Sequence, residues 1–264
     1  MIGIFDSGIG GLTVVKQIFK TLPQYKIMYF GDTARLPYGT KSKEAIIKFS
    51  IENTEFLLKK GAKIIVIACH TASSIAANIL REKFPNVPIF DVASSGLEKA
   101  VSISRRKRIG IMGTTGTIKS GVHEKFLKNL NPDIKVFPKA CSLLVPLIEE
   151  GWLKRMETRK ILRYYLRPLK LKQIDVLVLA CTHYPLLFKM INNISGKSVK
   201  IVDPAEELAL ELKSFIKKNP EIEAKLEKNG KKNKFYVSDV PYRFNDLSKK
   251  ILGEKIDVEK VDIS

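Results

Sequence analysis

The chain has 264 residues, 45% of them hydrophobic, and a formal net charge of +19 from 46 Lys and Arg against 27 Asp and Glu. This composition is typical of a globular protein with one large core or two modest domains. No apolar run approaches the roughly 18 residues of a membrane span, and the chain does not open with the basic stretch of a secretory signal. The three cysteines, an odd number, indicate free thiols in a reducing compartment, so we expect a cytoplasmic location.

The excess of positive charge would suit an acidic partner such as nucleic acid. However, many lysines are spread over predicted helix faces. The two densest basic stretches, 104–108 and 228–234, contain no interleaved aromatic residues on which bases could stack. We therefore interpret most of the charge as solvated surface and expect neither a nucleic-acid nor a membrane partner.

Short apolar runs alternate with helical patterns along most of the chain. Because these runs lack polar alternation, they predict strands that are covered on both faces, and therefore an α/β fold with mainly parallel sheets. Asp203 and Pro204 predict a helix start, since a capping acid precedes a proline at the first helical position. The eight predicted strands cover residues 2–5, 27–30, 64–68, 88–92, 109–112, 134–137, 176–180 and 199–202.

One pattern occurs twice. "IIVIACHTAS" (64–73) and "VLVLACTHYP" (176–185) each run from an apolar strand through an Ala-Cys pair to a His and a Thr. Each is preceded by a strand with a glycine turn, "IGIFDSG" and "IGIMGTTG". The repeat predicts two similar domains related by internal duplication, with a site in the cleft between them. We expect residues 1–93 with 205–264 in the first domain and 94–204 in the second. The 205–264 segment should pack back as helices, with a turn at Asn229-Gly230.

Ligands of open α/β sheets bind at the carboxyl ends of strands, where several polar motifs of this chain lie. "DSGIGGL" (6–12) lacks the G-x-G-x-x-G spacing of a dinucleotide site; its backbone N–H groups suit a small carboxylate instead. Zinc could use thiol and imidazole ligands, but adjacent Cys69 and His70 rarely point at one centre and no C-x-x-C pair is present. We therefore predict no metal or redox centre, and Cys141 is interpreted as a small buried hydrophobe.

The paired Ala-Cys strand ends favour acid/base chemistry. A thiol has a reference pKa of about 8.5, and a helix N-terminus lowers it, so one cysteine can act as a thiolate base while the other acts as an acid. Two such groups on opposite sides of one carbon can remove a proton and return it to the other face. This would invert a stereocentre without a cofactor.

The motifs "IGIFDSGIGGLTV", "YFGDTARLPYG", "VIACHTAS", "IGIMGTTGTIKSG", "LVPLIEEG" and "LVLACTHYPLL" resemble those of the cofactor-independent glutamate racemases of the aspartate/glutamate racemase superfamily. The resemblance implies two α/β domains, a homodimer, and conversion of L-glutamate to D-glutamate for bacterial peptidoglycan. It implies Cys69 and Cys181 as the proton-transfer pair, with Asp6 assisting Cys69, His183 assisting Cys181, and Glu149 near the site. The implied substrate-binding residues are Asp6, Ser7, Tyr38, Gly39, His70, Thr71, Thr114, Thr117, Thr182 and His183.

The sequence departs from the family pattern at several positions. His70 stands where the family usually has Asn, and His123 where it has Tyr; other departures are Asp91, Ser94-Ser95 and Ser142. A neutral imidazole offers one donor and one acceptor in fixed directions, unlike an amide, so His70 would perturb Cys69, change the substrate preference or block the site. Two alternatives stay open: a racemase for another acidic amino acid such as aspartate, and a nucleic-acid-binding protein with a degenerate site.

Overall fold

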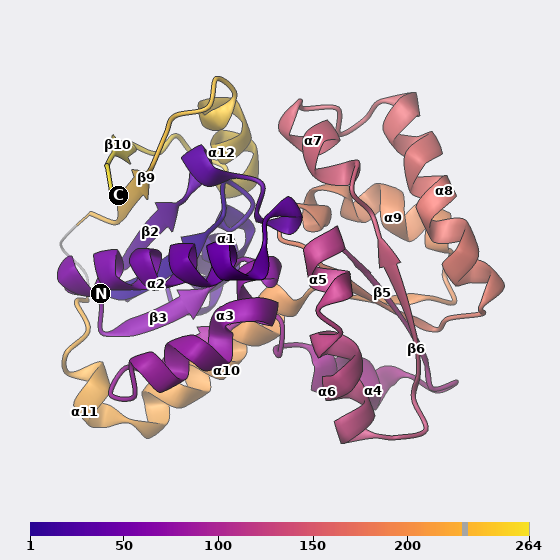
Figure 1. Cartoon of the computed structure of the whole chain (residues 1–264), viewed down its shortest axis with the longest axis horizontal. Coiled ribbons are helices and arrows are strands. Elements are labelled where there is room, and N and C mark those ends of the chain that lie inside the picture. Colours follow the sequence, from indigo (N-terminus) through magenta and orange to yellow (C-terminus); the bar gives the residue numbers. More distant parts are fainter. Residues whose placement is uncertain (229–231, 264) are drawn as a thin grey trace.

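The computed structural model describes residues 1–228 and 232–263, so the predicted turn at Asn229-Gly230 lies outside the described residues. Two sheets, each with only parallel strands, lie side by side and are wrapped by helices (Figure 1). We call the six-stranded sheet with its helices the first lobe and the four-stranded sheet with its helices the second lobe. The fold class predicted from the sequence is therefore confirmed.

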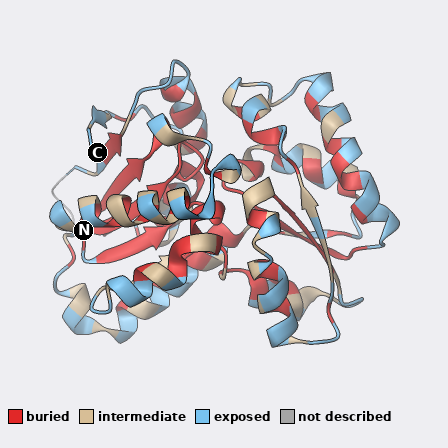
Figure 2. Ribbon diagram, viewed as in Figure 1, coloured by how far each residue is buried: buried red, intermediate tan, exposed pale blue. Residues whose placement is uncertain are grey.

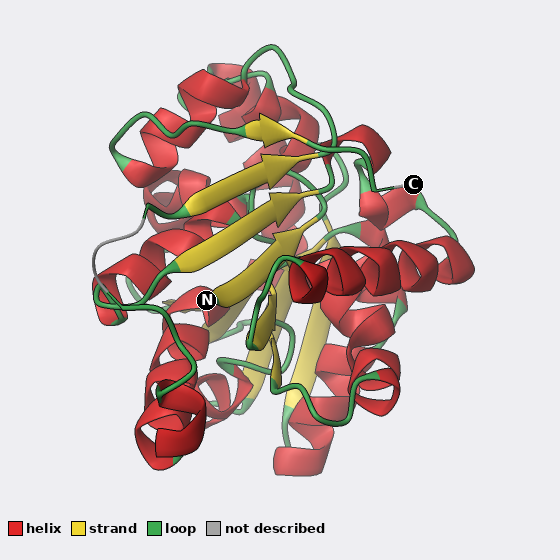
Figure 3. Cartoon of the chain, turned by 90° about the vertical axis from the view of Figure 1, so that its left-hand side faces the viewer, coloured by secondary structure: helices red, strands yellow, loops and turns green. Residues whose placement is uncertain are grey.

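The first sheet has the strand order β10-β9-β2-β1-β3-β4, and Figure 3 shows its strands pointing in one direction. The register of β1 aligns Ile4 with Tyr29 on one side and with Val66 on the other. Its strands are β1 (Ile2–Asp6), β2 (Ile27–Gly31), β3 (Ile64–Ile67), β4 (Ile89–Asp91), β9 (Lys234–Val237) and β10 (Glu259–Lys260).

The second sheet has the order β6-β5-β7-β8. This order matches β2-β1-β3-β4 of the first sheet strand for strand, as the predicted duplication requires. Consequently β3 and β7, the strands that precede the two Ala-Cys pairs, occupy equivalent places. The strands are β5 (Arg108–Gly113), β6 (Lys135–Ala140), β7 (Val176–Ala180) and β8 (Lys200–Val202).

Helices bury an apolar face on both sides of each sheet, and Figure 2 shows buried strands beneath helices with exposed outer faces. In the first lobe, α1 (Leu12–Thr21), α10 (Pro204–Lys218) and α12 (Phe244–Leu252) cover one side, and α2 (Lys43–Lys59) and α3 (His70–Lys83) the other. In the second lobe, α4 (Leu97–Ile103) and α6 (Val122–Leu130) lie opposite α7 (Leu144–Glu149), α8 (Met156–Leu171) and α9 (Phe188–Ser195). The short helices are η1 (Thr33–Arg35), η2 (Tyr38–Thr40), η3 (Tyr184–Leu187), α5 (Thr115–Lys119) and α11 (Pro220–Glu223).

The eight predicted strands are all present, with ends shifted by at most three residues. The expectation that 205–264 packs back as helices, with a loop or hairpin in its polar portion, missed β9 and β10, which add two strands to the first sheet. Phe235, Tyr236 and Val237 are buried beside β2, although the lysine-rich sequence before them predicts a polar loop. The predicted domain boundaries stay a prediction. No helix among the described residues is both long and apolar enough to cross a bilayer.

Candidate active site

The carboxyl ends of β1, β3, β5 and β7 meet between the two lobes, where they enclose a cavity of about 30 Å³. This space holds one or two water molecules. Ten residues predicted for the site line it: Ser7, Tyr38, Gly39, Cys69, His70, Thr71, Thr114, Cys181, Thr182 and His183. The other three touch these residues, since Asp6 bonds Thr182, Thr117 bonds Thr71 and Glu149 bonds His183. The fold thus brings together every residue that the resemblance implied.

Cys69 caps the N-terminus of α3. Its Sγ lies 3.5 Å from the backbone N of Ala72, which donates to it, and 3.5 Å from Oγ of Ser7. The sequence predicts a lowered thiol pKa at such a position, but burial, followed by the nearby Asp6 carboxylate, raises the pKa of Cys69 to about 12. Cys69 is therefore a protonated thiol in the closed cavity.

Cys181 follows β7 and has a different environment. Its Sγ lies 3.9 Å from Nδ1 of His183, whose Nε2 lies 3.0 Å from Oε1 of Glu149. Burial alone would lower the pKa of His183, but its hydrogen bonds to Cys181 and Glu149 raise this pKa to about 10. A protonated His183 therefore places a positive charge next to the Cys181 sulfur. The two thiols therefore lie in unlike surroundings.

Asp6 ends β1 and is fully buried. Its Oδ2 accepts a hydrogen bond of 2.9 Å from the backbone N of Gly8, and its Oδ1 accepts one of 3.4 Å from the Thr182 hydroxyl. Burial raises the pKa of Asp6, while the charge of His183 and the hydrogen bonds lower it. Gly10 leaves the space that His183 and Thr182 occupy, because a Cβ there would lie 2.5 Å from both Nδ1 of His183 and Oγ1 of Thr182.

Three hydroxyls join the lobes at the other side of the cavity. Oγ1 of Thr71, at the start of α3, lies 2.9 Å from Oγ1 of Thr114 and 3.1 Å from Oγ1 of Thr117, which are 3.0 Å from each other. Hydroxyls can reorient to donate or accept, so the group can exchange its mutual bonds for bonds to a bound carboxylate.

A hydrogen-bond network behind Tyr38 contains residues to which sequence reasoning assigned no role. The Tyr38 hydroxyl donates to Oδ2 of Asp32 and accepts from Nδ2 of Asn53 at 3.0 Å. Arg35 bonds the same Asp32 oxygen at 2.7 Å and Oδ1 of Asn53 at 3.0 Å. Burial and the Asp32 carboxylate raise the pKa of Tyr38 well above its usual value. Asp32 and Arg35 belong to the motif "GDTARLPYG", which is part of the family resemblance. This motif was the signal in the sequence that could have identified them.

His70 lines the cavity and stacks on His123 of α6, with ring centroids 5.7 Å apart and planes inclined by 29°. Nδ1 of His70 and both ring nitrogens of His123 are buried and have no hydrogen-bond partner among the described residues. Burial lowers the pKa of both rings, that of His123 to about 4, so the pair is neutral. Two departures from the family pattern therefore contact each other, which the sequence did not indicate.

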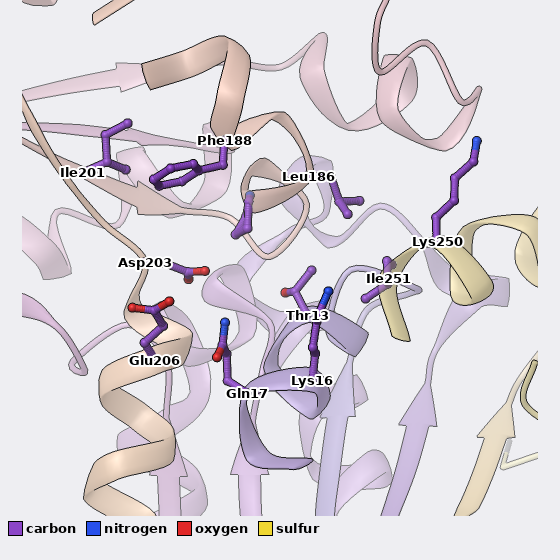
Figure 4. Close-up of a pocket in the computed structure, with 11 residues that line it drawn as sticks. Thr13, Lys16, Gln17, Leu186, Phe188, Ile201, Asp203, Glu206, Lys250 and Ile251 are labelled. Atoms are coloured by element: carbon purple, nitrogen blue, oxygen red, sulfur yellow. The ribbon is translucent and has the colours of Figure 1, made fainter. Parts of the chain in front are cut away.

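Two larger cavities flank the site. One, of about 390 Å³, shares Leu36, Pro37, Gly39, Thr114 and Val145 with the small cavity and extends to Ser142 and Glu149. The other, of about 340 Å³, contains none of the predicted site residues; Figure 4 shows Asp203 and Glu206 facing Lys16 and Gln17 across it. Thr13, which lines this cavity, also contacts the site, because its hydroxyl lies 2.9 Å from the carbonyl oxygen of Thr182.

Within residues 1–228 and 232–263, no group of three or more His, Cys, Asp or Glu side chains is arranged to hold a metal ion. All three cysteines are free. The polar groups that converge on the cavity are therefore thiols, imidazoles, hydroxyls and a carboxylate, and these suit proton transfer and the binding of a small zwitterion.

Comparison with known proteins agrees with this arrangement. The pattern of the Asp/Glu/Hydantoin racemase family matches residues 2–212. A glutamate racemase from Geobacter metallireducens is 43% identical over 263 residues, which cover 99% of this chain and 96% of the relative. The crystal structure of glutamate racemase from Francisella tularensis in complex with D-glutamate superposes with a TM-score of 0.91 at 35% identity, covering 99% of this chain and 97% of that one. Glutamate racemase from Aquifex pyrophilus gives a TM-score of 0.82 at 44% identity, over 98% and 97% of the two chains. The chain therefore belongs to the Asp/Glu/Hydantoin racemase family of isomerases.

Proposed function

We propose that the chain is a cofactor-independent glutamate racemase that interconverts L- and D-glutamate by two-thiol proton transfer. One observation carries the proposal: equivalent strands of the two lobes, β3 and β7, each end beside a cysteine that lines the same buried cavity. The glutamate racemases to which the chain is similar over nearly its full length support the choice of substrate.

In the proposed reaction, the thiolate of Cys181 removes the α-proton of bound glutamate. The S–H bond forms as the C–H bond breaks, and the electron pair of the C–H bond delocalises into the α-carboxylate. The thiol of Cys69 then donates its proton to the opposite face of the carbon. The product is the other enantiomer, with Cys69 left as the thiolate and Cys181 as the thiol, ready for the reverse direction.

The neighbours of each thiol support these roles. His183 carries a proton and sits between Cys181 and Glu149, so it compensates the charge of the Cys181 thiolate. When Cys69 becomes a thiolate, the N–H of Ala72 and the hydroxyl of Ser7 are the donors within reach. Asp6 is placed to accept from the substrate ammonium, and the threonine hydroxyls to donate to a carboxylate.

Binding requires a change of shape, because a cavity of about 30 Å³ holds water but not glutamate. The contacts that close it cross between the lobes, from Thr71 to Thr114 and from Thr13 to Thr182. We infer that these bonds open to admit substrate from the 390 Å³ cavity and reform around it.

The wider role follows from the same resemblance. We propose that the enzyme supplies D-glutamate for peptidoglycan, acts in the cytoplasm, and works as a homodimer. Its domains are proposed as 1–93 with 205–264, and 94–204. Size-exclusion chromatography with light scattering tests the dimer, and complementation of a D-glutamate auxotroph tests the role.

The deciding experiment follows L-glutamate in deuterated buffer by proton NMR and circular dichroism, with no cofactor added. The α-proton signal and the optical activity should disappear together. Cys69→Ala and Cys181→Ala should each abolish racemisation, whereas Cys141→Ala, which removes a buried thiol outside the cavity, should leave it intact. Full activity in either cavity variant would contradict the mechanism. Faster turnover of L-aspartate than of L-glutamate would contradict the substrate alone.

A further inference from the structure

Helix α8 carries a larger excess of positive charge than the other long helices that the structure describes. α8 contains five basic residues and one acidic residue, Glu157. The other two longest described helices, α2 and α10, each contain three basic and three acidic residues. The basic residues of α8 are Arg159, Lys160, Arg163, Arg167 and Lys170, and all are exposed. α8 thus contributes four of the 19 net positive charges, five basic residues less one acidic.

The inner and outer faces of α8 differ sharply. Its inner face is part of the second-lobe core through Leu162, Tyr165, Leu166 and Leu169. On the outer face, Arg159, Arg163 and Arg167 recur every four residues and form one stripe along the helix. None of these three arginines pairs with a carboxylate in the part of the chain that the structure describes.

Large apolar side chains lie beside the arginine stripe. Met156 is 67% exposed, Tyr164 is 71% exposed and Leu171 is 74% exposed. At 100° per residue, all three project from the solvent-facing half of the helix, next to Lys160. The outer face therefore combines a cationic stripe with an exposed apolar one.

The basic surface continues past the first turn of the helix. A cavity of about 450 Å³ there is lined by Lys154, Arg155, Arg159 and Lys189 around apolar residues that include Leu187 and Met190, and no acidic residue lines it. Figure 1 shows α8 at the end of the second lobe, away from the first lobe. A partner bound to this surface would leave the space between the lobes free.

We propose that the outer face of α8 docks on a bilayer surface that contains anionic phospholipids. Basic side chains beside exposed apolar ones on a single helix face fit the two layers of such a surface: phosphates attract the cations, and the apolar groups enter the boundary between headgroups and acyl chains. The contact is peripheral, and it would revise the expectation of no membrane partner.

Other partners fit this face less well. A second copy related by a two-fold axis would bring two sets of unpaired arginines together, and like charges repel. Nucleic acid would satisfy the arginines, but it offers no apolar environment to Met156 and Leu171. These two side chains therefore distinguish a bilayer from other polyanions.

The test is sedimentation of the full chain with phosphatidylcholine vesicles, with and without phosphatidylglycerol. The chain should bind only the anionic vesicles, and the fluorescence of its single tryptophan, Trp152, should shift to shorter wavelength. Replacing Arg159, Arg163 and Arg167 together with Gln should lower the partition coefficient about 100-fold, at about fivefold per cation. The matched control replaces Lys213, Lys217 and Lys218 of α10 with Gln, removes the same charge, and should change binding little.

A further variant keeps the charge and removes the apolar contribution. Met156→Ser with Leu171→Ser should weaken vesicle binding while racemase activity, the measure of folding for every variant, stays unchanged. Equal losses in the two triple variants would overturn the proposal, since binding would then follow overall charge. Unchanged binding of the Ser variant would also overturn it. Binding of duplex DNA without binding of vesicles, lost only in the α8 arginine variant, would replace the bilayer with a nucleic acid.

Discussion

The imidazole rings of His70 and His123 stack in the interior, 5.7 Å apart between centroids, although they come from different lobes. Asp91 is the charged group close enough to raise the pKa of His123, against the larger effect of burial. Its Oδ2 also lies 3.0 Å from Oγ of Ser94, another departure from the family pattern. These departures are therefore neighbours in space, and a change at one alters the surroundings of the next.

His123→Phe should stabilise the protein. The substitution removes two buried nitrogens that lack partners, while a phenyl ring keeps the contact with His70. Since a buried unsatisfied polar group costs about 1–3 kcal/mol, we expect the free energy of unfolding to rise by about 1 kcal/mol at neutral pH. Urea denaturation measures it, with His123→Gln as the polar control. A clear loss of stability in the Phe variant would mean that the nitrogens are satisfied in solution.

The same ring predicts instability in acid. The pKa of His123 is lowered to about 4, so the unfolded chain takes up a proton on this residue before the folded chain does. Protonation of this residue therefore favours the unfolded chain. The free energy of unfolding is unaffected above about pH 6.5 and falls by about 3 kcal/mol as the pH drops from there towards 4. His123→Phe should flatten the stability profile across this range. An unchanged profile would rule out His123 as its cause.

Glu149→Gln should change how the free energy of unfolding falls at alkaline pH. The pKa of His183 is raised to about 10, so its protonation stabilises the folded chain. This stabilisation is complete below about pH 6.5 and is lost as the pH rises through 10. Without the Glu149 carboxylate this pKa falls, so the loss, which still begins near pH 6.5, is complete at a lower pH and is smaller in total. NMR titration of the His183 ring measures the shift. Glu150→Gln, a neighbouring exposed substitution, should leave the titration unchanged, and so would Glu149→Gln if the contact were absent in solution.

Gly10→Ala should abolish most activity while the chain remains folded. The new Cβ would lie 2.5 Å from both Nδ1 of His183 and Oγ1 of Thr182, so His183 must move away from Cys181. Misplaced catalytic groups cost on the order of 100-fold in rate. The control is Gly253→Asn, where a Cβ meets nothing within 4 Å and Asn tolerates the left-handed conformation. A Gly10→Ala enzyme with normal kcat would show that His183 need not hold its present position.

Cys69 should resist alkylation in the absence of substrate. With its pKa raised from 9.0 to about 12, the thiolate fraction at neutral pH is about 1,000-fold below that of an ordinary thiol. Iodoacetamide should therefore modify Cys69 no faster than the cavity opens. Peptide mass spectrometry measures the rate of labelling. Rapid labelling of Cys69 in the folded protein would indicate an open cavity at rest.

The sequence predicts the strands well, because strands buried on both faces leave continuous apolar runs such as 64–68 and 176–180. It fails at β9, where the core contact of Phe235 and Tyr236 is made with a strand some 200 residues earlier, and a lysine-rich approach obscures the run. Local pattern carries no signal for such a pairing.

The site was predictable in its membership but not in its electrostatics. Doubled Ala-Cys ends and the resemblance point to Cys69 and Cys181, yet the helix N-terminus predicts a lowered pKa for Cys69 and burial raises it instead. The degree of burial depends on both lobes closing together, as does the contact of His70 with His123. Neither is encoded in a local stretch of sequence.

Equivalent strands carry the two thiols, but their neighbours are unlike: a hydroxyl and a backbone N–H beside Cys69, an imidazole held by a carboxylate beside Cys181. Mirror-image substrates have equal free energies, so the equilibrium constant of a racemase is one and kcat/KM must be the same in both directions. Because the surroundings of the two bases are unequal, kcat and KM can each differ between the two enantiomers, but only by the same factor. An enzyme built this way would turn over one enantiomer faster while binding it more weakly, and would still favour neither at equilibrium.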